Sequence, residues 1–179
     1  VVGGGVWELA QENRALNVKK VLVRREAPPL GKAAVQDVEA ILRDTDIDTV
    51  VEVLGGLHPA YEWICRALAA GKDVVTANKA VISAYYRELT ALAHENGAAL
   101  RCTAAVGGGI PWLVNLQRCR RVDTVTEVGG IMNGTTNFIM DAMARQGADF
   151  PTVLQRAQEL GYAEADPSAD IDGDDIRRK

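Results

Sequence analysis

The sequence predicts an α/β fold, a Rossmann-like doubly wound parallel sheet followed by an α+β region. Short runs of β-branched residues alternate with helical patterns of about 10–15 residues, which is the spacing of βαβ units. Glycines at 71 and 97 end two of these helical patterns directly before the next apolar run. From about Pro111 the alternation stops, so we expect two domains, at residues 1–105 and 106–179.

The elements of the first domain follow from local patterns. A helix is expected at 6–15, behind three glycines, and a strand at 18–23 that ends in two arginines. Prolines make 26–32 a loop. Pro59 in the first turn and Gly71 after the last turn mark the clearest helix. The remaining elements are strands at 49–54, 73–76 and 99–103 and helices at 37–43, 59–70 and 83–96.

The second domain is expected to mix helices with strand-like segments. The expected elements are a helix at 111–117, a strand-like run at 123–131, a polar turn at 133–137, and helices at 138–145, at 152–160 and from about Asp174. The chain starts at a glycine-rich turn with no strand before it and stops where a helix begins. We therefore expect part of a longer protein, with the first strand missing and the second domain incomplete.

Composition excludes several classes of protein. The formal net charge is −4, and acidic and basic residues are mixed along the chain, which argues against a nucleic-acid groove. No apolar run reaches the length of a membrane span, and no signal peptide is visible in the sequence. Cys65, Cys102 and Cys119 lie far apart without metal-site spacing, so we expect reduced cysteines in a cytoplasmic protein.

Loops at the carboxyl ends of the predicted strands are the expected ligand-binding positions. Gly3 and its two glycine neighbours could supply the last glycine of a dinucleotide fingerprint. Arg24 and Arg25 end the second strand, where arginine favours the 2′-phosphate of NADP, although Glu26 follows directly. The alternative is that both arginines are solvated side chains after an edge strand.

Lys79 closes the run TANK directly after a buried strand. There it could donate to a carboxylate or a carbonyl of a ligand. A plain surface lysine at a helix start is the alternative, but a positive charge is unfavourable at that end of a helix. His94 is expected to be a surface residue, and a cofactor contact of His58 is a weaker hypothesis.

The last residues of the chain, 164–179, contain a regular pattern of charged residues. Six acidic residues stand between Glu164 and Asp175, and Lys179 follows four residues after Asp175, on the same face of a helix. Such a site suits proton exchange by a lysine beside carboxylates that bind a cationic group. The alternative is that these acidic residues only cap the helix and bind no ligand. A calcium loop fails, because Lys179 occupies the position that needs a bidentate glutamate.

The runs TANK, AAVGGGIP, GIMNGTTNFI and GYAEADPSADIDGDDIRRK together resemble homoserine dehydrogenase, strongly from about Thr49 onward and more loosely before it. The resemblance implies an NAD(P)-binding Rossmann domain at 1–105 and a dimerisation and catalytic domain at 106–179. It implies NAD(P)-dependent interconversion of L-homoserine and L-aspartate 4-semialdehyde, in threonine and methionine biosynthesis, by a cytoplasmic homodimer or higher homo-oligomer.

The resemblance also implies roles for particular residues. Lys179 would transfer the proton, and Asp175, Glu164 and Asp170 would bind the substrate. Lys79 would stand between cofactor and substrate. The residues expected to bind NADP or NAD are Val2, Gly3, Arg24, Arg25, Thr76, Asn78, Lys79 and Gly161.

The family often binds Na⁺ or K⁺ as well, which would assign backbone carbonyls of Val106, Gly108 and Ile110 to the cation. Thr103 stands where the family has a glutamate, so a cation would be bound more weakly. The competing hypothesis is an inactive nucleotide-binding module, which would be indifferent to Lys179→Ala. The choice between NAD and NADP, a regulatory domain, a fused aspartate kinase and threonine feedback are not given by the sequence.

Overall fold

A computed structural model describes residues 2–25 and 27–177. The chain divides into two compact units, unit 1 at Val1–Gly108 and unit 2 at Gly109–Lys179. The division falls a few residues after the 105/106 boundary expected from the sequence.

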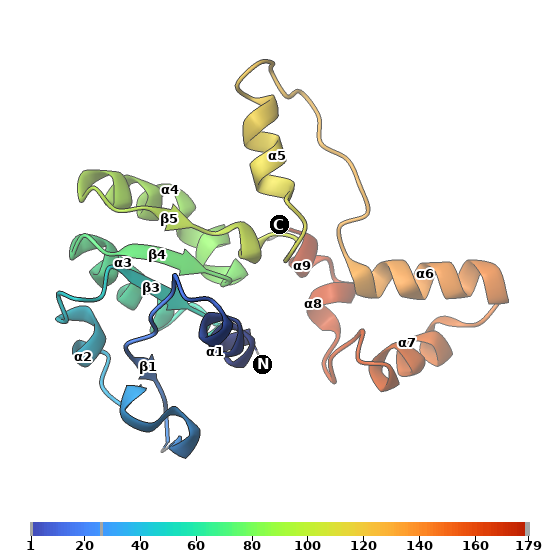
Figure 1. Cartoon of the computed structure of the whole chain (residues 1–179). Helices are drawn as coiled ribbons and strands as arrows, with labels where there is room; N and C mark the ends of the chain where they lie inside the picture. Colours follow the sequence, from blue (N-terminus) through green and yellow to red (C-terminus); the bar gives the residue numbers. More distant parts are fainter. Residues whose placement is uncertain (1, 26, 178–179) are drawn as a thin grey trace. The chain divides into compact units, whose positions relative to one another are not determined.

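Unit 1 is built on a three-stranded parallel sheet in the order β3-β4-β5 (Figure 1). These strands are β3 (Thr49–Glu52), β4 (Asp73–Thr76) and β5 (Leu100–Arg101). Helices α3 (Ala60–Ala69) and α4 (Lys79–Glu95) connect them and pack against each other. The fully buried side chains include Ile64, Leu68, Val74, Val81 and Leu89. The predicted Rossmann-like α/β arrangement is confirmed.

A second, smaller sheet precedes this one. β1 (Val21–Leu22) pairs in parallel with β2 (Ala34–Val35), across the 3₁₀ segment η1 (Pro28–Ala33). β2 was not expected, because two residues are too few to leave an alternating pattern. The short helix predicted next is confirmed as α2 (Glu39–Leu42).

The first helix corrects the sequence prediction. α1 (Val2–Glu12) begins before residue 6 and contains the three glycines that we expected to precede it. A Cβ added to Gly3 would lie 3.3 Å from Val53 Cγ2, just beyond β3. Glycine therefore allows α1 to approach the end of β3 closely, which is one of the uses of glycine in dinucleotide-binding folds.

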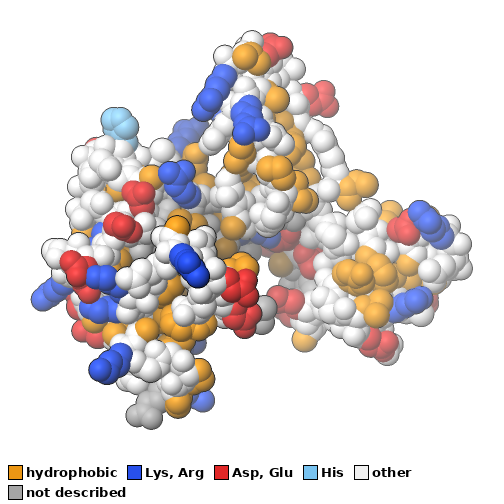
Figure 2. All heavy atoms as spheres, viewed as in Figure 1, with side chains coloured by type: hydrophobic (Ala, Val, Ile, Leu, Met, Phe, Trp, Pro, Cys, Tyr) orange, Lys and Arg blue, Asp and Glu red, His pale blue; other side chains and the backbone are white. Residues whose placement is uncertain are grey.

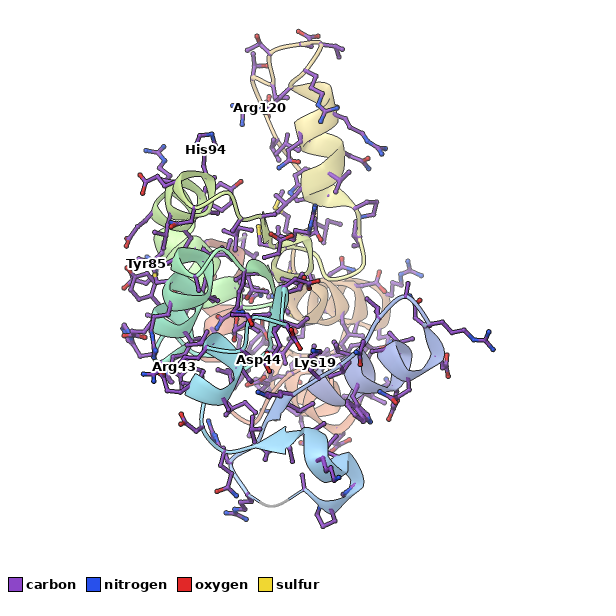
Figure 3. All side chains as sticks on the ribbon, turned by 60° about the vertical axis from the view of Figure 1, so that its left-hand side comes forward. Lys19, Arg43, Asp44, Tyr85, His94 and Arg120 are labelled. Carbon is purple, nitrogen blue, oxygen red and sulfur yellow. The ribbon has the colours of Figure 1, made fainter. Side chains whose placement is uncertain are left out.

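The start of β3 is held by lysines. Lys72 is buried, and its Nζ donates to the carbonyl oxygens of Asp44 and Ile47, at 2.6 Å each. Lys20 Nζ lies 2.7 Å from Asp44 Oδ2 and lowers the pKa of that carboxyl. Figure 3 shows Lys19 and Asp44 close together in this part of unit 1. The turn before β3 is thus fixed by backbone and charged contacts.

The described part of unit 2 is helical. Its helices are α5 (Trp112–Cys119), α6 (Gly134–Gln146), α7 (Phe150–Glu159), α8 (Ser168–Ile171) and α9 (Asp174–Arg177). α6 and α7 pack together through Ile139, Ala142, Val153 and Ala157. The helix predicted from Asp174 is confirmed as α9, whereas α8 was not expected.

The strand-like run predicted at 123–131 is wrong at the level of local structure. The backbone there is irregular, and it pairs with no strand among the described residues. Ile131 is 81% exposed and Val122, just before the run, 87%. β-rich composition makes a strand only where another strand satisfies the backbone.

The surface carries both signs of charge. Figure 2 shows acidic and basic side chains interspersed on the visible faces of both units. None of the helices in the described part of the chain combines the length and the apolar character needed to span a membrane.

Candidate functional site

The carboxyl edge of the main sheet is organised by one buried carboxylate. Glu52 ends β3, and its register partner Thr76 ends β4. Thr76 Oγ1 donates to Glu52 Oε2 at 2.5 Å, and Leu54 N donates to Oε1 at 2.7 Å. Asn78 Nδ2 donates to Oε1 at 3.4 Å and to the carbonyl oxygen of Gly56 at 2.8 Å. These five residues, called the Glu52 cluster below, fasten the loop after β3 to the loop after β4.

The cluster defines what Thr76 and Asn78 can do. Their side chains are buried, with exposed fractions of 1% and 4%. Both hydrogens of the Asn78 amide are used inside the protein, and its Oδ1 accepts from Val81 N at 3.2 Å as the N-cap of α4. Their predicted contribution to cofactor binding is therefore to shape the loop, with only backbone groups left for direct contact.

Lys79 is the first residue of α4, directly after its cap. The helix thus begins four residues before the predicted start at Ser83, because Asn78 caps it. Lys79 is half-buried and places its charge at the positive end of the helix macrodipole, which is unfavourable by itself. The N-terminus of a helix is also a favourable position for a negatively charged group of a ligand.

The other predicted cofactor residues of unit 1 lie on separate elements. Val2 is 56% exposed at the start of α1, and Gly3 packs toward Val53. Arg24 and Arg25 are exposed in the bend after β1. That bend is at the carboxyl end of a parallel strand, as a ribose or 2′-phosphate contact requires.

In unit 2 a buried amide joins the acidic tail to α6. Asn133 is 4% exposed, and its Nδ2 donates to Asp170 Oδ1 at 2.7 Å and to Asp175 Oδ2 at 3.2 Å. Its Oδ1 accepts from Thr136 N at 2.7 Å as the N-cap of α6. We call these four residues the Asn133 cluster. Two of the predicted substrate carboxylates are thereby brought to one donor.

The segment between α7 and α8 is fastened to the same helix. Buried Thr135 donates its hydroxyl to the carbonyl oxygen of Tyr162 at 2.6 Å, and the Tyr162 ring stacks on Phe138 with centroids 4.7 Å apart. Gln158 Nε2 donates to the carbonyl oxygen of Glu164 at 3.1 Å. The Glu164 side chain itself is exposed, as a ligand-binding carboxylate can be. Gly161 ends α7 at a φ of 77°.

The roles predicted for all these residues stay predictions, and for two of the sites the described residues add little. Lys179 lies outside the described residues. Of the three carbonyls expected at a cation, Val106 and Gly108 belong to unit 1 and Ile110 to unit 2, and Thr103 is exposed at the start of η2 (Thr103–Ala105). Over residues 2–25 and 27–177 no group of three or more His, Cys, Asp and Glu side chains could hold a metal ion.

The cysteines and His94 can be compared with what the sequence predicted. Cys65, Cys102 and Cys119 are free, and burial raises the pKa of Cys65 and of Cys102. His94 is exposed and points outward from the end of α4 in Figure 3, which confirms the surface position expected for it.

Glu52 and Asn133 were missed in the sequence. Glu52 is the one charged residue in the apolar run TVVEVL, and a charge inside a buried strand is a signal that could have been used. Asn133 is a residue type that favours the N-cap position, so it could have predicted that α6 begins at Gly134 and that the expected polar turn at 133–137 is its first turn.

Two family models match the chain. The model described as homoserine dehydrogenase, NAD binding domain, matches residues 1–103, and the model described as homoserine dehydrogenase matches residues 111–179. The two matches cover most of both units.

Curated relatives agree with these models. A homoserine dehydrogenase of Synechocystis sp. is 44% identical over 192 aligned residues, which cover 99% of this chain and 44% of the relative. One of Corynebacterium glutamicum is 45% identical over 170 residues, covering 94% of this chain and 38% of the relative. The chain thus spans less than half the length of the curated relatives it matches.

Solved structures show the same similarity. The crystal structure of a homoserine dehydrogenase from Thiobacillus denitrificans matches 99% of this chain and 44% of its own, with a TM-score of 0.90 and 38% identity. A hyperthermophilic archaeal homoserine dehydrogenase in complex with NADPH matches 80% of this chain and 44% of its own, with a TM-score of 0.73 and 31% identity.

Proposed function

The chain belongs to the homoserine dehydrogenase family, and we propose that the protein carrying it interconverts L-homoserine and L-aspartate 4-semialdehyde with NAD(P). The observation that carries the proposal is the Asn133 cluster. Asp170 and Asp175 accept from one buried amide, so two negative charges lie close together, which is an arrangement that could bind a substrate ammonium group.

The NAD(P)-binding role rests on the carboxyl edge of unit 1. Gly3 allows α1 to approach β3, and the Glu52 cluster holds the two loops between which a dinucleotide would lie. Arg24 and Arg25 would bind a 2′-phosphate, and Lys79 would stand between cofactor and substrate. When bound, the nicotinamide supplies or accepts the hydride.

The proton that the reaction requires would be transferred by a residue of this chain. In the reducing direction the aldehyde carbon gains a hydride and its oxygen gains a proton, which Lys179 would donate from Nζ. Asp175, Asp170 and Glu164 would bind the substrate's ammonium and hydroxyl groups and hold the carbonyl toward that lysine. Gly161 would leave room on the nicotinamide side.

Further properties complete the proposal. The protein would act in the cytoplasm, in threonine and methionine biosynthesis, as a homodimer or higher homo-oligomer. Backbone carbonyls of Val106, Gly108 and Ile110 would bind Na⁺ or K⁺ weakly, since Thr103 offers only a neutral oxygen. Its substrates are small molecules.

The test is oxidation of NADPH and NADH by the full-length protein with L-aspartate 4-semialdehyde. We expect turnover, and we expect Lys179→Ala to lower kcat by about 10²–10⁴-fold, the usual contribution of a positioned general acid. Cofactor affinity, measured by fluorescence titration, should stay unchanged. A preference for NADPH would support the role of the two arginines.

Arg177→Ala provides the matched control, because Arg177 is an exposed cation of α9, paired with Asp174 at 2.9 Å. Its removal should leave kcat within about twofold of wild type, since surface ion pairs of this kind contribute little. A folded wild-type protein without turnover on either cofactor would contradict the enzyme and favour a binding module.

A further inference from the structure

We propose that Asn133 is a positioning residue, whose side-chain amide fixes the two carboxylates that receive the substrate's ammonium group. This inference rests on the proposed function and names a residue that acts on the reaction only through Asp170 and Asp175. α8 and α9, which carry these aspartates, lie beside the first turn of α6 (Figure 1).

The orientation of the Asn133 amide is determined by the helix that it caps. Its Oδ1 accepts from Thr136 N at 2.7 Å and lies 3.0 Å from Thr136 Oγ1. A flipped amide would set Nδ2 against the Thr136 N–H, two donors facing each other, and the cap would be lost. Nδ2 must therefore point away from α6, where both carboxylates are found.

The donor capacity of the amide matches its partners. Nδ2 carries two hydrogens, and Asp170 Oδ1 and Asp175 Oδ2 accept one each, at 2.7 and 3.2 Å. Asn133 is buried, so water does not compete well for these hydrogens. Both carboxylates are only half-buried, so a cationic group of a ligand can still reach them.

The aspartates need such a support. They lie on helices of only four residues, α8 and α9, and helices this short are not stable by themselves. Two carboxylates near each other also repel, and a donor shared by both offsets the repulsion. An asparagine supplies that donor without adding a charge that would cancel theirs.

A purely structural role as a helix cap is the competing explanation, and Asn133→Asp separates the two. Aspartate keeps the acceptor for Thr136 N and is as good a cap as asparagine, so any loss of stability in this variant comes from repulsion between carboxylates and not from loss of the cap. It replaces the donor by an oxygen that faces Asp170 and Asp175. We expect kcat/KM for L-homoserine to fall about 100-fold, with KM for the cofactor unchanged.

The pH profile gives a signature that a cap alone would not produce. In Asn133→Asp three carboxyl groups face one another, from the start of α6, from α8 and from α9, and mutual repulsion favours one bound proton. Once protonated, the substituted carboxyl group can donate a hydrogen bond again. The activity of the variant relative to wild type should therefore rise as the pH falls.

The matched control is Asp149→Ala. Asp149 caps α7 in the same way, with Oδ1 accepting from Thr152 N at 3.1 Å. This variant should lose stability and keep wild-type kcat/KM, whereas Asn133→Ala should lose both. As a readout independent of turnover, the increase in thermal midpoint that L-homoserine produces without cofactor should disappear in Asn133→Asp and persist in Asp149→Ala.

The outcomes are distinguishable. Wild-type turnover together with an Asn133→Asp variant of normal kcat/KM and normal pH profile would overturn the positioning role alone. A folded wild-type protein that turns over neither substrate would overturn the proposed function and this role with it.

Discussion

The Glu52 cluster in unit 1 and the Asn133 cluster in unit 2 both join separate segments through one buried side chain, but they differ in where the negative charge lies. In unit 1 the buried centre is a carboxylate, and neutral groups of Thr76, Asn78 and the loop backbone donate to it. In unit 2 the buried centre is a neutral amide, and the groups gathered around it are carboxylates.

The difference concerns where the charge is used. Glu52 is 5% exposed, and its charge is used inside the protein to join two loops. Asp170 and Asp175 are half-buried, so their charge remains accessible to a ligand. A buried charge surrounded by donors thus builds a scaffold, whereas a buried neutral donor can present charge to a substrate.

The largest effect is expected from removing the centre in unit 1. Glu52→Ala leaves the buried Thr76 hydroxyl, and one hydrogen of the Asn78 amide, without an acceptor, which should lower the free energy of unfolding by about 2–4 kcal/mol. Glu52→Gln keeps the shape but turns one acceptor oxygen into a donor, so about half of that loss is expected. Denaturant unfolding of the full-length protein measures both, and NADPH affinity should fall in parallel.

Glu95→Gln is the control for this comparison, because Glu95 is exposed at the end of α4. A surface charge away from such networks should matter by less than about 0.5 kcal/mol. If Glu52→Ala were no more destabilising than Glu95→Gln, the carboxylate would not be the centre of the two loops.

Removing a charge in unit 2 is expected to affect substrate binding more than stability. Asp170→Asn or Asp175→Asn should change the free energy of unfolding by less than about 1 kcal/mol, because each relieves repulsion while its amide oxygen still accepts, more weakly, from Asn133. The KM for L-homoserine should rise at least about tenfold, since an ammonium group loses a charged partner. Calorimetric unfolding and steady-state kinetics on the same preparations test the separation.

A large loss of stability in these two variants, comparable with that in Glu52→Ala, would contradict the difference between the clusters. The carboxylates of unit 2 would then be part of the scaffold. Unchanged KM in both variants would instead remove them from the substrate site.

Local patterns predicted much of the fold, and distant partners account for the rest. β4 is found at 73–76 as expected, since a run of β-branched residues bounded by glycine and a cap needs no other information. The strand expected at 123–131 failed, because no pattern within it reveals whether another strand is available. The two-residue β2 left no pattern at all.

The candidate sites were also predictable only in part, because their contacts join residues that are distant in the sequence. Asp170 and Asp175 could be singled out from the acidic tail, but their common donor could not. Asn133 lies 37 and 42 residues earlier in the chain, and Glu52 is separated from Thr76 by 24. Such pairings depend on the packing of α6 and on strand register, which sequence spacing does not give.

The smallest expected effect is on the stability of the helix caps, because a neutral cap and a charged cap can be compared directly. Asn133 caps α6 without a titratable group, whereas Asp149 caps α7 with a carboxyl whose pKa is lowered by hydrogen bonds from the side chain and backbone of Thr152. A lowered folded-state pKa means that the stabilisation is present above the unfolded-state pKa and is lost as the pH falls through the folded-state value.

Below pH 3.8, the ordinary value for this carboxyl, the α7 cap should therefore weaken while the α6 cap does not. Amide exchange reports each cap separately, so the protection of Thr152 N should fall relative to that of Thr136 N on acidification. In Asp149→Asn, whose cap does not titrate, the ratio should stay constant with pH. A ratio that falls equally in the variant would trace the acid sensitivity of the α7 cap to a group other than Asp149.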